Sequence, residues 1–380
     1  RQHSSVVRGD ALRILNTIAG IRTAEVSKIY RQKNEDYRKV VEELSKGNVK
    51  QAFEKLDSMG AIKDVDPIKP NETLIKDFLE VIKKKKTALI ISPTHAQGES
   101  LTKELRNKLR ADGLIGKKEI AVARLTNLNL TEAEKKDWRN LKKGLVVQFN
   151  QNVSGVNRGS QLSIEDVSEF EIKLKNSEGL IVALPITKLQ NIDVYKKNEI
   201  ALSKGDKINI TRNSFDKNDK RLNNGQNLEV ASFDKSGNVV VRNAKSKNTY
   251  SLPQDFGHIS YAYCVTSHAS QGKTVDEVFI SQPASTFPAT DAKQFYVSVS
   301  RARNKVHIYT DDKASLLEYA SQIGDRQSAI ELVSKNDSHQ KFVEQVIREK
   351  NQEAQKIRSS NIERSKENIS TSAIKNEQRL

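Results

Sequence analysis

The sequence contains few of the residues that form covalent or metal cross-links: among its 380 residues there is a single cysteine, Cys264. One cysteine excludes internal disulfides and zinc sites built from cysteine, and it favours a reducing compartment, so we expect a cytoplasmic protein. No apolar run approaches the roughly 18 to 20 residues that a membrane span requires, and the first residues lack the apolar core of a signal peptide. Neither membrane insertion nor a secretory leader is expected.

An initiator methionine is also lacking, because the sequence opens on Arg1. We therefore expect a piece of a longer polypeptide. Its length allows two or three domains of roughly 100 to 200 residues each. Hydrophobic residues make up 36% of the chain and charged residues 29%, which is enough apolar material for folded cores and leaves part of the chain as tail or solvated helix.

Positive charge dominates the surface chemistry. The 64 Lys and Arg residues against 48 Asp and Glu give a formal net charge of +16. Because Lys and Arg displace the counterions condensed on a phosphate backbone, this excess favours a polyanionic partner. On charge alone, a basic protein without a nucleic-acid partner stays open as an alternative.

Residues 37–112 have the pattern of an α/β domain. Upstream of them, residues 11–21 predict a short helix and residues 24–30 a strand. One or two amphipathic helices are predicted over residues 37–59 and further helices over residues 71–83 and 98–112. Between the last two, residues 87–92 form a strand that is apolar on both faces, as in a parallel sheet covered by helices. The turn Pro93-Thr94-His95 follows this strand, at the end where open α/β sheets bind ligands.

Residues 144–252 change to short apolar runs separated by Gly, Asn and Asp, which is typical of a small β-barrel. Helical and strand patterns alternate again over residues 261–309. The α/β domain is therefore predicted to be interrupted by the barrel. Beyond residue 327 the chain is polar with sparse apolar residues, and we expect a solvated helix followed by a disordered end.

The tetrapeptide Gln271-Gly272-Lys273-Thr274 ends like a P-loop, but its spacing excludes one. A P-loop requires a glycine five positions before Gly272, and Ser267 occupies that position. No other G-x-x-x-x-G-K-[ST] occurs in the sequence. A nucleotide bound by this chain alone would lack the P-loop lysine and the hydroxyl that binds Mg²⁺.

The wider segment from Tyr263 to Asp276 resembles motif V of superfamily 1 helicases, in particular the T-x-H-x-S-Q-G-x-T pattern of the RecD-like branch. The resemblance implies that Gln271 and Gly272 lie against the γ-phosphate of the nucleotide. It also implies three contacts with the DNA backbone, from Thr266, His268 and Ser270. The alternative is a turn rich in Ser and Gly with a histidine satisfied by its neighbours.

The segment Tyr296-Val297-Ser298-Val299-Ser300-Arg301-Ala302-Arg303 looks like motif VI of the same branch. An arginine at the end of a strand can present a planar, permanently charged fork to a transferring phosphoryl group. Arg301 matches the arginine finger of the family, whereas a structural, solvent-facing role for Arg303 stays at least as plausible.

Two upstream segments agree with this order. The run Gln2-His3-Ser4-Ser5-Val6 with Gly9 resembles the second half of motif III, in which Gln2 would link γ-phosphate sensing to DNA. The run Ile29-Tyr30-Arg31-Gln32 resembles motif IV, in which Arg31 would reach the γ-phosphate. Taken singly, Arg31 is an ordinary surface charge.

Two further segments resemble DNA-binding parts of these helicases. Thr94 and His95 match the turn that grips the single-strand backbone. The stretch around Gly205-Asp206 and Asn213, with Asn224-Gly225, is similar to the inserted SH3-like barrel, which implies that Asn213 contacts DNA. The alternative for both is ordinary turn chemistry, since Asn-Gly is a good hairpin turn.

The collinear motifs predict an α/β fold: a RecA-like second motor domain, with a parallel sheet and helices on both faces, interrupted by a small SH3-like β-barrel and followed by a helical or disordered tail. We expect the remnant of a first RecA-like domain at 1–30, the first part of the second domain at 31–140, the barrel at 141–255, the second part at 256–326 and the tail at 327–380. The narrower resemblance is to the helicase part of bacterial conjugative relaxases of the TraI/TrwC kind.

The resemblance implies an ATP-dependent helicase that translocates on single-stranded DNA, from 5′ to 3′, with ATP and Mg²⁺ held mainly by an N-terminal part outside this sequence. The implied partners are single-stranded DNA, N-terminal RecA-like and relaxase domains in the same polypeptide, and conjugative secretion machinery. Motifs I, Ia and II and the relaxase residues are absent, so the chain by itself is expected to hydrolyse nothing, and no metal site is predicted. The alternative is a non-catalytic module, derived from a helicase, that binds or docks single-stranded DNA.

Overall fold

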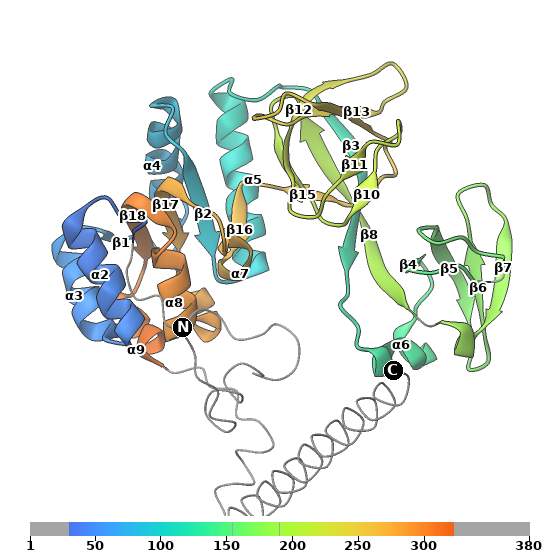
Figure 1. The fold of residues 1–380 in the computed structure, drawn as a ribbon, viewed down its shortest axis with the longest axis horizontal. Coiled ribbons are helices and arrows are strands. Elements are labelled where there is room, and N and C mark those ends of the chain that lie inside the picture. Colours follow the sequence, from blue (N-terminus) through green and yellow to red (C-terminus); the bar gives the residue numbers. More distant parts are fainter. Residues whose placement is uncertain (1–29, 154, 190, 323–380) are drawn as a thin grey trace, which may run out of the picture. The chain divides into compact units, whose positions relative to one another are not determined.

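The computed structural model of the protein describes residues 30–153, 155–189 and 191–322 (Figure 1). Gln2, the helix predicted at 11–21, nearly all of the strand predicted at 24–30 and the polar tail after residue 327 lie outside these residues. Among the residues that are described, no helix has the length and apolar character needed to cross a membrane.

A five-stranded parallel sheet forms the centre of the α/β part, in the order β1-β18-β17-β2-β16. The predicted strand at 87–92 is confirmed as β2, next to strands that come almost 200 residues later in the chain. The strands are β1 (Ile62–Asp64), β2 (Ala88–Ser92), β16 (Cys264–Thr266), β17 (Val275–Ser281) and β18 (Ala302–Thr310).

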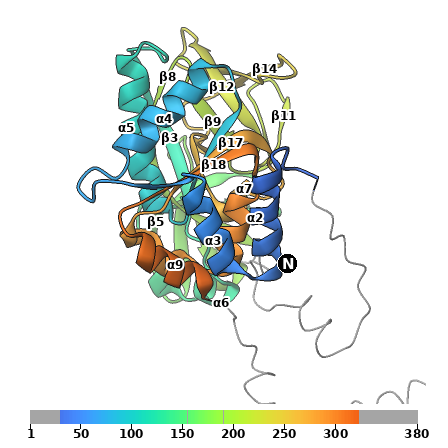
Figure 2. The same ribbon diagram turned by 90° about the vertical axis from the view of Figure 1, so that its left-hand side faces the viewer.

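Helices cover both faces of this sheet (Figures 1 and 2). Side chains alternate along each strand, so Ile91 packs into one core and Ile90 into the other. The first core contains α2 (Glu35–Lys46), α3 (Val49–Ser58), α8 (Ala292–Val299) and α9 (Lys313–Ser321), and the second contains α4 (Glu72–Lys83) and α5 (His95–Ala111). The predicted parallel sheet with helices on both faces is confirmed.

Local signals explain where these helices begin and end. Asn34 caps α2 by accepting a hydrogen bond from the Tyr37 backbone N–H, and Gly47, with a φ of 91°, ends the helix in the left-handed conformation that glycine tolerates. The helix predicted at 98–112 is α5, which begins three residues earlier because Thr94 caps it. The N-cap places His95 in the first turn of the helix.

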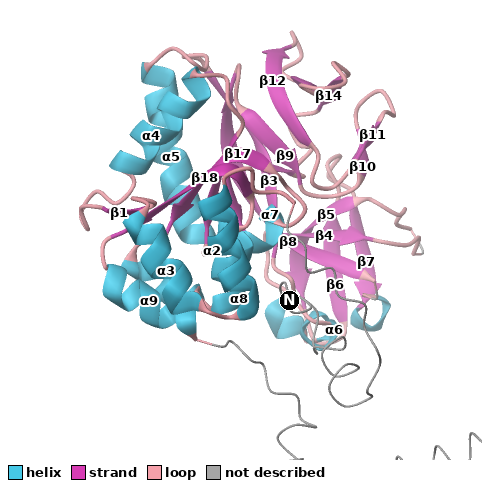
Figure 3. Ribbon diagram, turned by 60° about the vertical axis from the view of Figure 1, so that its left-hand side comes forward, coloured by secondary structure: helices cyan, strands magenta, loops and turns pink. Residues whose placement is uncertain are grey.

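The remaining strands are antiparallel and form two larger sheets and one hairpin. The six-stranded sheet has the order β3-β8-β4-β5-β6-β7, the five-stranded sheet has the order β14-β13-β12-β9-β15, and β10 pairs with β11. Figure 3 shows these strands in magenta. Their bounds are β3 (Glu119–Asn127), β4 (Leu145–Phe149), β5 (Gln161–Val167), β6 (Glu171–Lys175), β7 (Ile181–Pro185), β8 (Ile192–Ser203), β9 (Lys207–Ile210), β10 (Ser214–Phe215), β11 (Arg221–Leu222), β12 (Asn227–Phe233), β13 (Val239–Arg242), β14 (Thr249–Leu252) and β15 (Ile259–Tyr261).

The long strand β8 is shared by two small hydrophobic cores. Ile192 and Val194, at its start, pack among β4 to β7, whereas Ile200 and Leu202, at its end, pack among β9 to β15. Over the whole of β3, the two strands pair residue by residue from Glu119↔Ser203 onward. Short helices complete this part: α6 (Glu132–Lys136), η1 (Trp138–Asn140) and η2 (Ile186–Lys188).

Two expectations differ from this structure. Antiparallel pairing begins at Glu119, before the predicted start of the barrel at 141, and its strands form two sheets with separate cores. The SH3-like classification and the domain boundaries stay predictions. The expectation that Arg301 ends a strand is wrong: Asp291 caps helix α8, which runs to Val299, so Arg301 lies between a helix and the start of β18.

Candidate functional site

The carboxyl ends of β2 and β16 lie side by side at one edge of the parallel sheet. The register pairs Thr266 with Ser92, so each strand leads into its turn at the same level. Thr94 follows β2 and caps α5, its Oγ1 accepting a hydrogen bond from the Gln97 N–H at 3.3 Å. Thr266 ends β16 and caps the short helix α7 (Ser267–Ser270), its Oγ1 accepting from the Ala269 N–H at 3.3 Å. The structure thus brings together two threonines that the sequence predicted to contact DNA.

The two predicted histidines belong to the same pair of turns. His95 is the first residue of α5 and is exposed, and His268 lies exposed in α7. Exposed donors next to helix N-termini can approach a phosphate group. Ser270 differs from them: it is fully buried, and its hydroxyl donates to the Ser267 carbonyl at 2.6 Å. The structure therefore leaves no exposed surface of Ser270 for the predicted DNA contact.

The segment after α7 is a turn that leads into strand β17. Gln271 and Gly272 are exposed, and Gly272 has a φ of +81° with open space where a Cβ would lie. A P-loop runs from a strand through a loop into a helix, whereas Lys273 lies between a helix and a strand. This order agrees with the rejection of a P-loop on spacing. Burial lowers the pKa of the half-buried Lys273 below its ordinary value.

Arg31 and Arg301 converge at the carboxyl end of α8. Arg31 Nη1 donates to the Ser300 carbonyl at 2.6 Å. Arg301 donates through Nε to the Val297 carbonyl at 2.8 Å and through Nη2 to Ser300 Oγ at 2.7 Å. The last carbonyls of a helix have no partner within the helix, so these donors satisfy them. The predicted motif IV and motif VI arginines therefore lie together, and both contact Ser300.

The described residues supply no negative charge that would balance the positive charges of Arg31 and Arg301. Arg301 is 1% exposed, and burial together with the positive charge of Arg31 lowers the pKa of Arg301 to about 10. At neutral pH it stays protonated. Within the part of the chain that the structure describes, no carboxylate forms an ion pair with Arg31 or Arg301. Two guanidinium groups without a counterion are a place where an anion would be stabilised.

Two neighbours of this pair were not predicted from the sequence. Gln32 is buried and donates through Nε2 to the carbonyls of Ser300, at 3.1 Å, and Ala302, at 2.9 Å. The hydroxyl of buried Tyr37 donates to the Val299 carbonyl. Both side chains hold the end of α8 in place. No signal in a single sequence distinguishes Gln32 from a surface glutamine, because its partners lie about 270 positions away.

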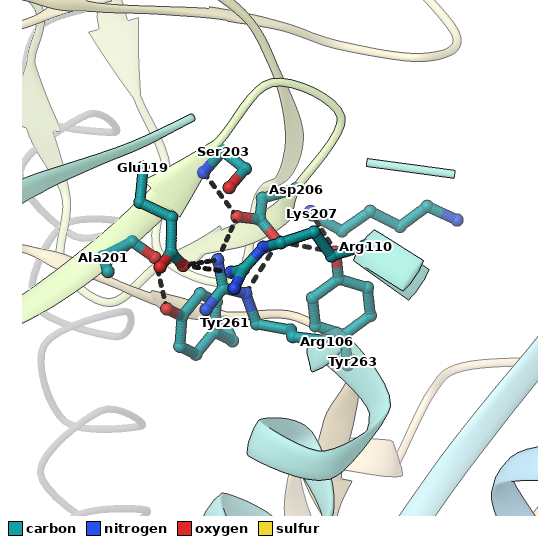
Figure 4. A network of polar contacts seen from close by, with 9 residues as sticks. All are labelled: Arg106, Arg110, Glu119, Ala201, Ser203, Asp206, Lys207, Tyr261 and Tyr263. Carbon is teal, nitrogen blue, oxygen red and sulfur yellow. Dashed lines mark hydrogen bonds and ion pairs between the residues drawn. The ribbon is translucent and has the colours of Figure 1, made fainter. Parts of the chain in front are cut away.

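A buried network ties α5 to the antiparallel part, and Arg106 is its centre (Figure 4). Its guanidinium donates to both oxygens of Asp206, at 2.9 and 2.7 Å, and to Glu119 at 3.0 Å. The Tyr263 hydroxyl donates to Asp206 at 2.8 Å, and Arg106 lies 4.5 Å from the centre of the Tyr261 ring. Burial raises the pKa of Tyr261 to about 12. The network joins the helix that begins at the Thr94 turn to β3, to the turn between β8 and β9, and to β15.

A pattern in the sequence could have singled out Arg106. It adjoins the apolar stripe of Leu101, Leu105 and Leu109, which is buried, and a charged side chain at such a position needs a partner. The last predicted residue, Asn213, lies in the antiparallel part. It is exposed, and its Oδ1 accepts a hydrogen bond from the Asn224 N–H at 2.8 Å. Asn213 therefore does not join the group around Thr94 and Arg301 through any contact of the described residues.

Two known protein families match segments of the chain that carry predicted site residues. Residues 1–67 match the AAA domain family, and residues 261–309 match the UvrD-like helicase C-terminal domain family. The first segment includes Gln2 and Arg31, and the second includes Thr266 and Arg301. No curated protein matches the sequence.

Solved structures of helicases also resemble the chain. A Pif1 helicase from Bacteroides, in complex with ADP-AlF3 and single-stranded DNA, is 17% identical with a TM-score of 0.28, covering 77% of this chain and 53% of that one. A Pif1 helicase from Candida albicans is 13% identical with a TM-score of 0.26, covering 76% and 57%. The chain spans little more than half the length of these structures. The two family matches therefore show a likeness of one segment to an AAA domain and of another to a UvrD-like helicase C-terminal domain.

Proposed function

We propose that the chain is the second motor domain, with its β insert, of an ATP-dependent helicase that moves along single-stranded DNA. One observation carries this proposal: Arg31 and Arg301, from the two ends of the described chain, meet at Ser300 and have no carboxylate partner among the residues that the structure describes. A transferring phosphoryl group supplies the missing negative charge, and arginine forks stabilise that charge as it develops.

The residues of this chain fit one face of a nucleotide and leave the other to the rest of the protein. Arg31 and Arg301 would bind the γ-phosphate, and the resemblance to motif V implies that the exposed residues Gln271 and Gly272 lie against it as well. Among the residues described, no group of three or more His, Cys, Asp and Glu side chains could hold a metal ion. Hydrolysis of bound ATP would supply the free energy for movement, and we assign the binding of ATP and Mg²⁺ mainly to an N-terminal motor domain, as the motif resemblance implies.

The paired turns at the sheet edge would hold the DNA. Thr94 and His95 on one turn, and Thr266 and His268 on the other, offer hydroxyls, imidazoles and helix N-termini to a phosphate backbone. A hydrogen bond links the residues proposed to bind the phosphate to those proposed to bind DNA. The N–H of Val275, which follows the α7 turn, donates to the Arg301 carbonyl at 3.4 Å. A shift of Arg301 toward a phosphate would therefore reach the turn that carries Thr266 and His268.

The narrower assignment, to the helicase part of a bacterial conjugative relaxase with 5′ to 3′ movement, is part of this proposal and rests on motif phrases alone. Its distinguishing phrases include Tyr261-Ala262-Tyr263 ahead of motif V. Both tyrosines belong to the buried Arg106 network, which gives them a structural reason to be present. Relaxase domains and secretion machinery as partners depend on this narrower assignment.

The test is ATP turnover by a protein in which this chain continues from a complete AAA domain, measured with and without single-stranded DNA. Arg301→Lys keeps the charge but loses the planar fork, so we expect DNA-stimulated turnover to fall by about 1000-fold or more. The matched control is Arg303→Lys, whose guanidinium is half exposed and lies 4.0 Å from Asp276. Equal turnover by the Arg301 and Arg303 variants would show that Arg301 is not the finger.

A second function is favoured by one observation, the complete burial of Arg301. A guanidinium that only holds the end of α8 would suit a non-catalytic module that binds single-stranded DNA. Under this reading the protein with its AAA domain binds DNA, but Arg301→Lys changes only its stability and leaves any ATP turnover unaltered.

A further inference from the structure

The junction between α8 and β18 is held by side chains from the other end of the described chain. Gln32 Nε2 donates to the carbonyls of Ser300, at 3.1 Å, and Ala302, at 2.9 Å. Arg31 Nη1 donates to the same Ser300 carbonyl at 2.6 Å. Both junction residues are buried, at 3% and 0% exposure. Gln32 therefore bridges two carbonyls of a buried junction, and one of these carbonyls has two donors.

The groups proposed to bind phosphate are in contact with the protein in this arrangement. Arg31 uses Nη1 for the Ser300 carbonyl, and Arg301 uses Nε for the Val297 carbonyl and Nη2 for Ser300 Oγ. A guanidinium is planar and rigid, so one that turns two N–H groups toward a phosphate carries its other N–H groups with it. We therefore expect binding of the γ-phosphate to exchange contacts with the end of α8 for contacts with the nucleotide.

Both carbonyls that would lose an arginine have a second donor. The Ser300 carbonyl keeps Gln32 Nε2 at 3.1 Å, and the Val297 carbonyl keeps Ser300 Oγ at 3.1 Å. A buried carbonyl without a donor is costly, because it has lost its contact with water and gained none in exchange. With the second donors in place, the end of α8 stays satisfied when the arginines move away.

Packing alone does not explain the side chain of Gln32. It is 3% exposed, and its Oε1 has no hydrogen-bond partner among the described residues. The amide thus uses its donors and leaves its acceptor unused, which is uncommon for a buried polar group. An apolar side chain would fill the same space without an unpaired oxygen. What it would lack is the pair of hydrogen bonds to Ser300 and Ala302.

We propose that Gln32 is a positioning residue for the phosphate-binding arginines. It holds the α8–β18 junction in place while Arg31 moves from the Ser300 carbonyl to the γ-phosphate. Arg301, which extends from the same junction, then keeps a fixed starting point. Without the amide of Gln32, the movement of Arg31 would leave the Ser300 carbonyl unpaired, and binding of the phosphate would be weaker for that reason. The inference rests on the proposed function and deepens it, since Gln32 acts through the arginines.

The test compares two states of the nucleotide that differ at the γ-phosphate position. The chain joined to a complete AAA domain is titrated into N-methylanthraniloyl-ADP, with and without aluminium fluoride, which takes the place of a transferring phosphoryl group. Gln32→Met keeps the length of the side chain and removes both donors. We expect it to weaken binding with aluminium fluoride by about 10-fold or more, but to keep binding of ADP alone within about 2-fold, because ADP has no γ-phosphate toward which Arg31 could move.

The matched control is Gln294→Met. Gln294 lies on α8, is 5% exposed, and also has an Oε1 without a partner among the described residues. Its Nε2 donates to Ser298 Oγ at 3.2 Å, so the change removes a buried hydrogen bond from the same helix but none of those that hold the junction. We expect Gln294→Met to bind both states of the nucleotide within about 2-fold of the unaltered protein. If Gln32→Met does not fold, Gln32→Asn replaces it, because that amide is too short to bridge both carbonyls, and the same selective weakening is expected.

Two results overturn the inference: a Gln32 variant that behaves like Gln294→Met, or one that weakens both states of the nucleotide equally, as a merely structural role predicts. Adding Gln32→Met to a protein that already carries Arg31→Ala should change binding by no more than about 2-fold, because no arginine then leaves the Ser300 carbonyl. A full further loss there contradicts the inference as well. The proposed function fails separately, if Arg301→Lys binds both states of the nucleotide as the unaltered protein does.

Discussion

The buried carboxylate of Asp206 supports the sharpest stability prediction. It is 0% exposed and accepts four hydrogen bonds: two from Arg106 at 2.9 and 2.7 Å, one from the Tyr263 hydroxyl at 2.8 Å and one from the Ser203 N–H at 2.6 Å. Asp206→Asn keeps the shape of the side chain but removes its charge. It also replaces one acceptor oxygen with a donor that points at other donors.

The magnitude follows from the burial of the partner. Breaking a buried ion pair from one side typically costs about 3 to 5 kcal/mol, because the remaining charge stays in a low-dielectric site without compensation. Arg106 is itself buried but keeps Glu119 at 3.0 Å, so we expect a loss near the lower end, about 3 kcal/mol. Arg106→Met should cost a similar amount. The double variant should lose less than the sum of the two single variants, because the interaction is counted once.

Urea unfolding of the full chain, followed by the circular dichroism signal of its β-strands, measures this loss. Glu165→Gln is the control, since its pair with Lys143 is an exposed surface contact, and it should unfold at the same urea concentration as the unaltered chain. A loss below about 1 kcal/mol for Asp206→Asn would show instead that the Arg106 network contributes no more than an exposed pair.

Three further predictions concern single positions. Burial lowers the pKa of His258 to about 4, so below about pH 6.5 the unfolded chain binds a proton at this residue while the folded chain does not. Between pH 7 and pH 4.5 the free energy of unfolding of the unaltered protein should therefore fall by about 2 kcal/mol more than that of the His258→Asn variant. Urea unfolding at both pH values measures the two losses, and equal losses would contradict this. Gly257→Ala should lower the melting temperature more than Gly272→Ala, because both φ angles are positive but only at Gly257 would a Cβ lie 2.6 Å from a Leu125 carbon; equal shifts would count against it. Thr94→Val should cost about 1 kcal/mol through the lost cap of α5, and an unchanged urea midpoint would exclude that capping role.

Short-range patterns in the sequence predicted much of the α/β part. The spacing of Val40, Val41 and Leu44 anticipated α2, and the apolar run at 87–92 anticipated a parallel strand with helices on both faces. Both elements were predictable for one reason: a buried helix stripe or a doubly covered strand leaves its periodicity in consecutive residues. The roles of Arg31 and Arg301 at the γ-phosphate came from the motif resemblance and stay predictions, although the structure places both side chains on Ser300.

What failed depended on partners that are distant in the sequence. Val297 and Val299, with a tyrosine before them, favour a strand by propensity, but the Asp291 cap and packing in the first core make the segment helical. The pairing of β3 with β8 joins residues up to 84 positions apart (Glu119 and Ser203). Nor does any local pattern reveal that Arg106 meets Asp206 across 100 positions. Such contacts are set by tertiary packing, which a single sequence does not display.

We propose that this chain belongs to a motor and not to a passive DNA-binding module. The decisive measurement is the rate of ATP turnover of the chain joined to a complete AAA domain, across a titration of single-stranded oligo-dT. We expect turnover to rise steeply with oligo-dT, and we expect Arg301→Lys to abolish the rise while oligo-dT still binds. ATP turnover that stays flat at oligo-dT concentrations that saturate binding would contradict it.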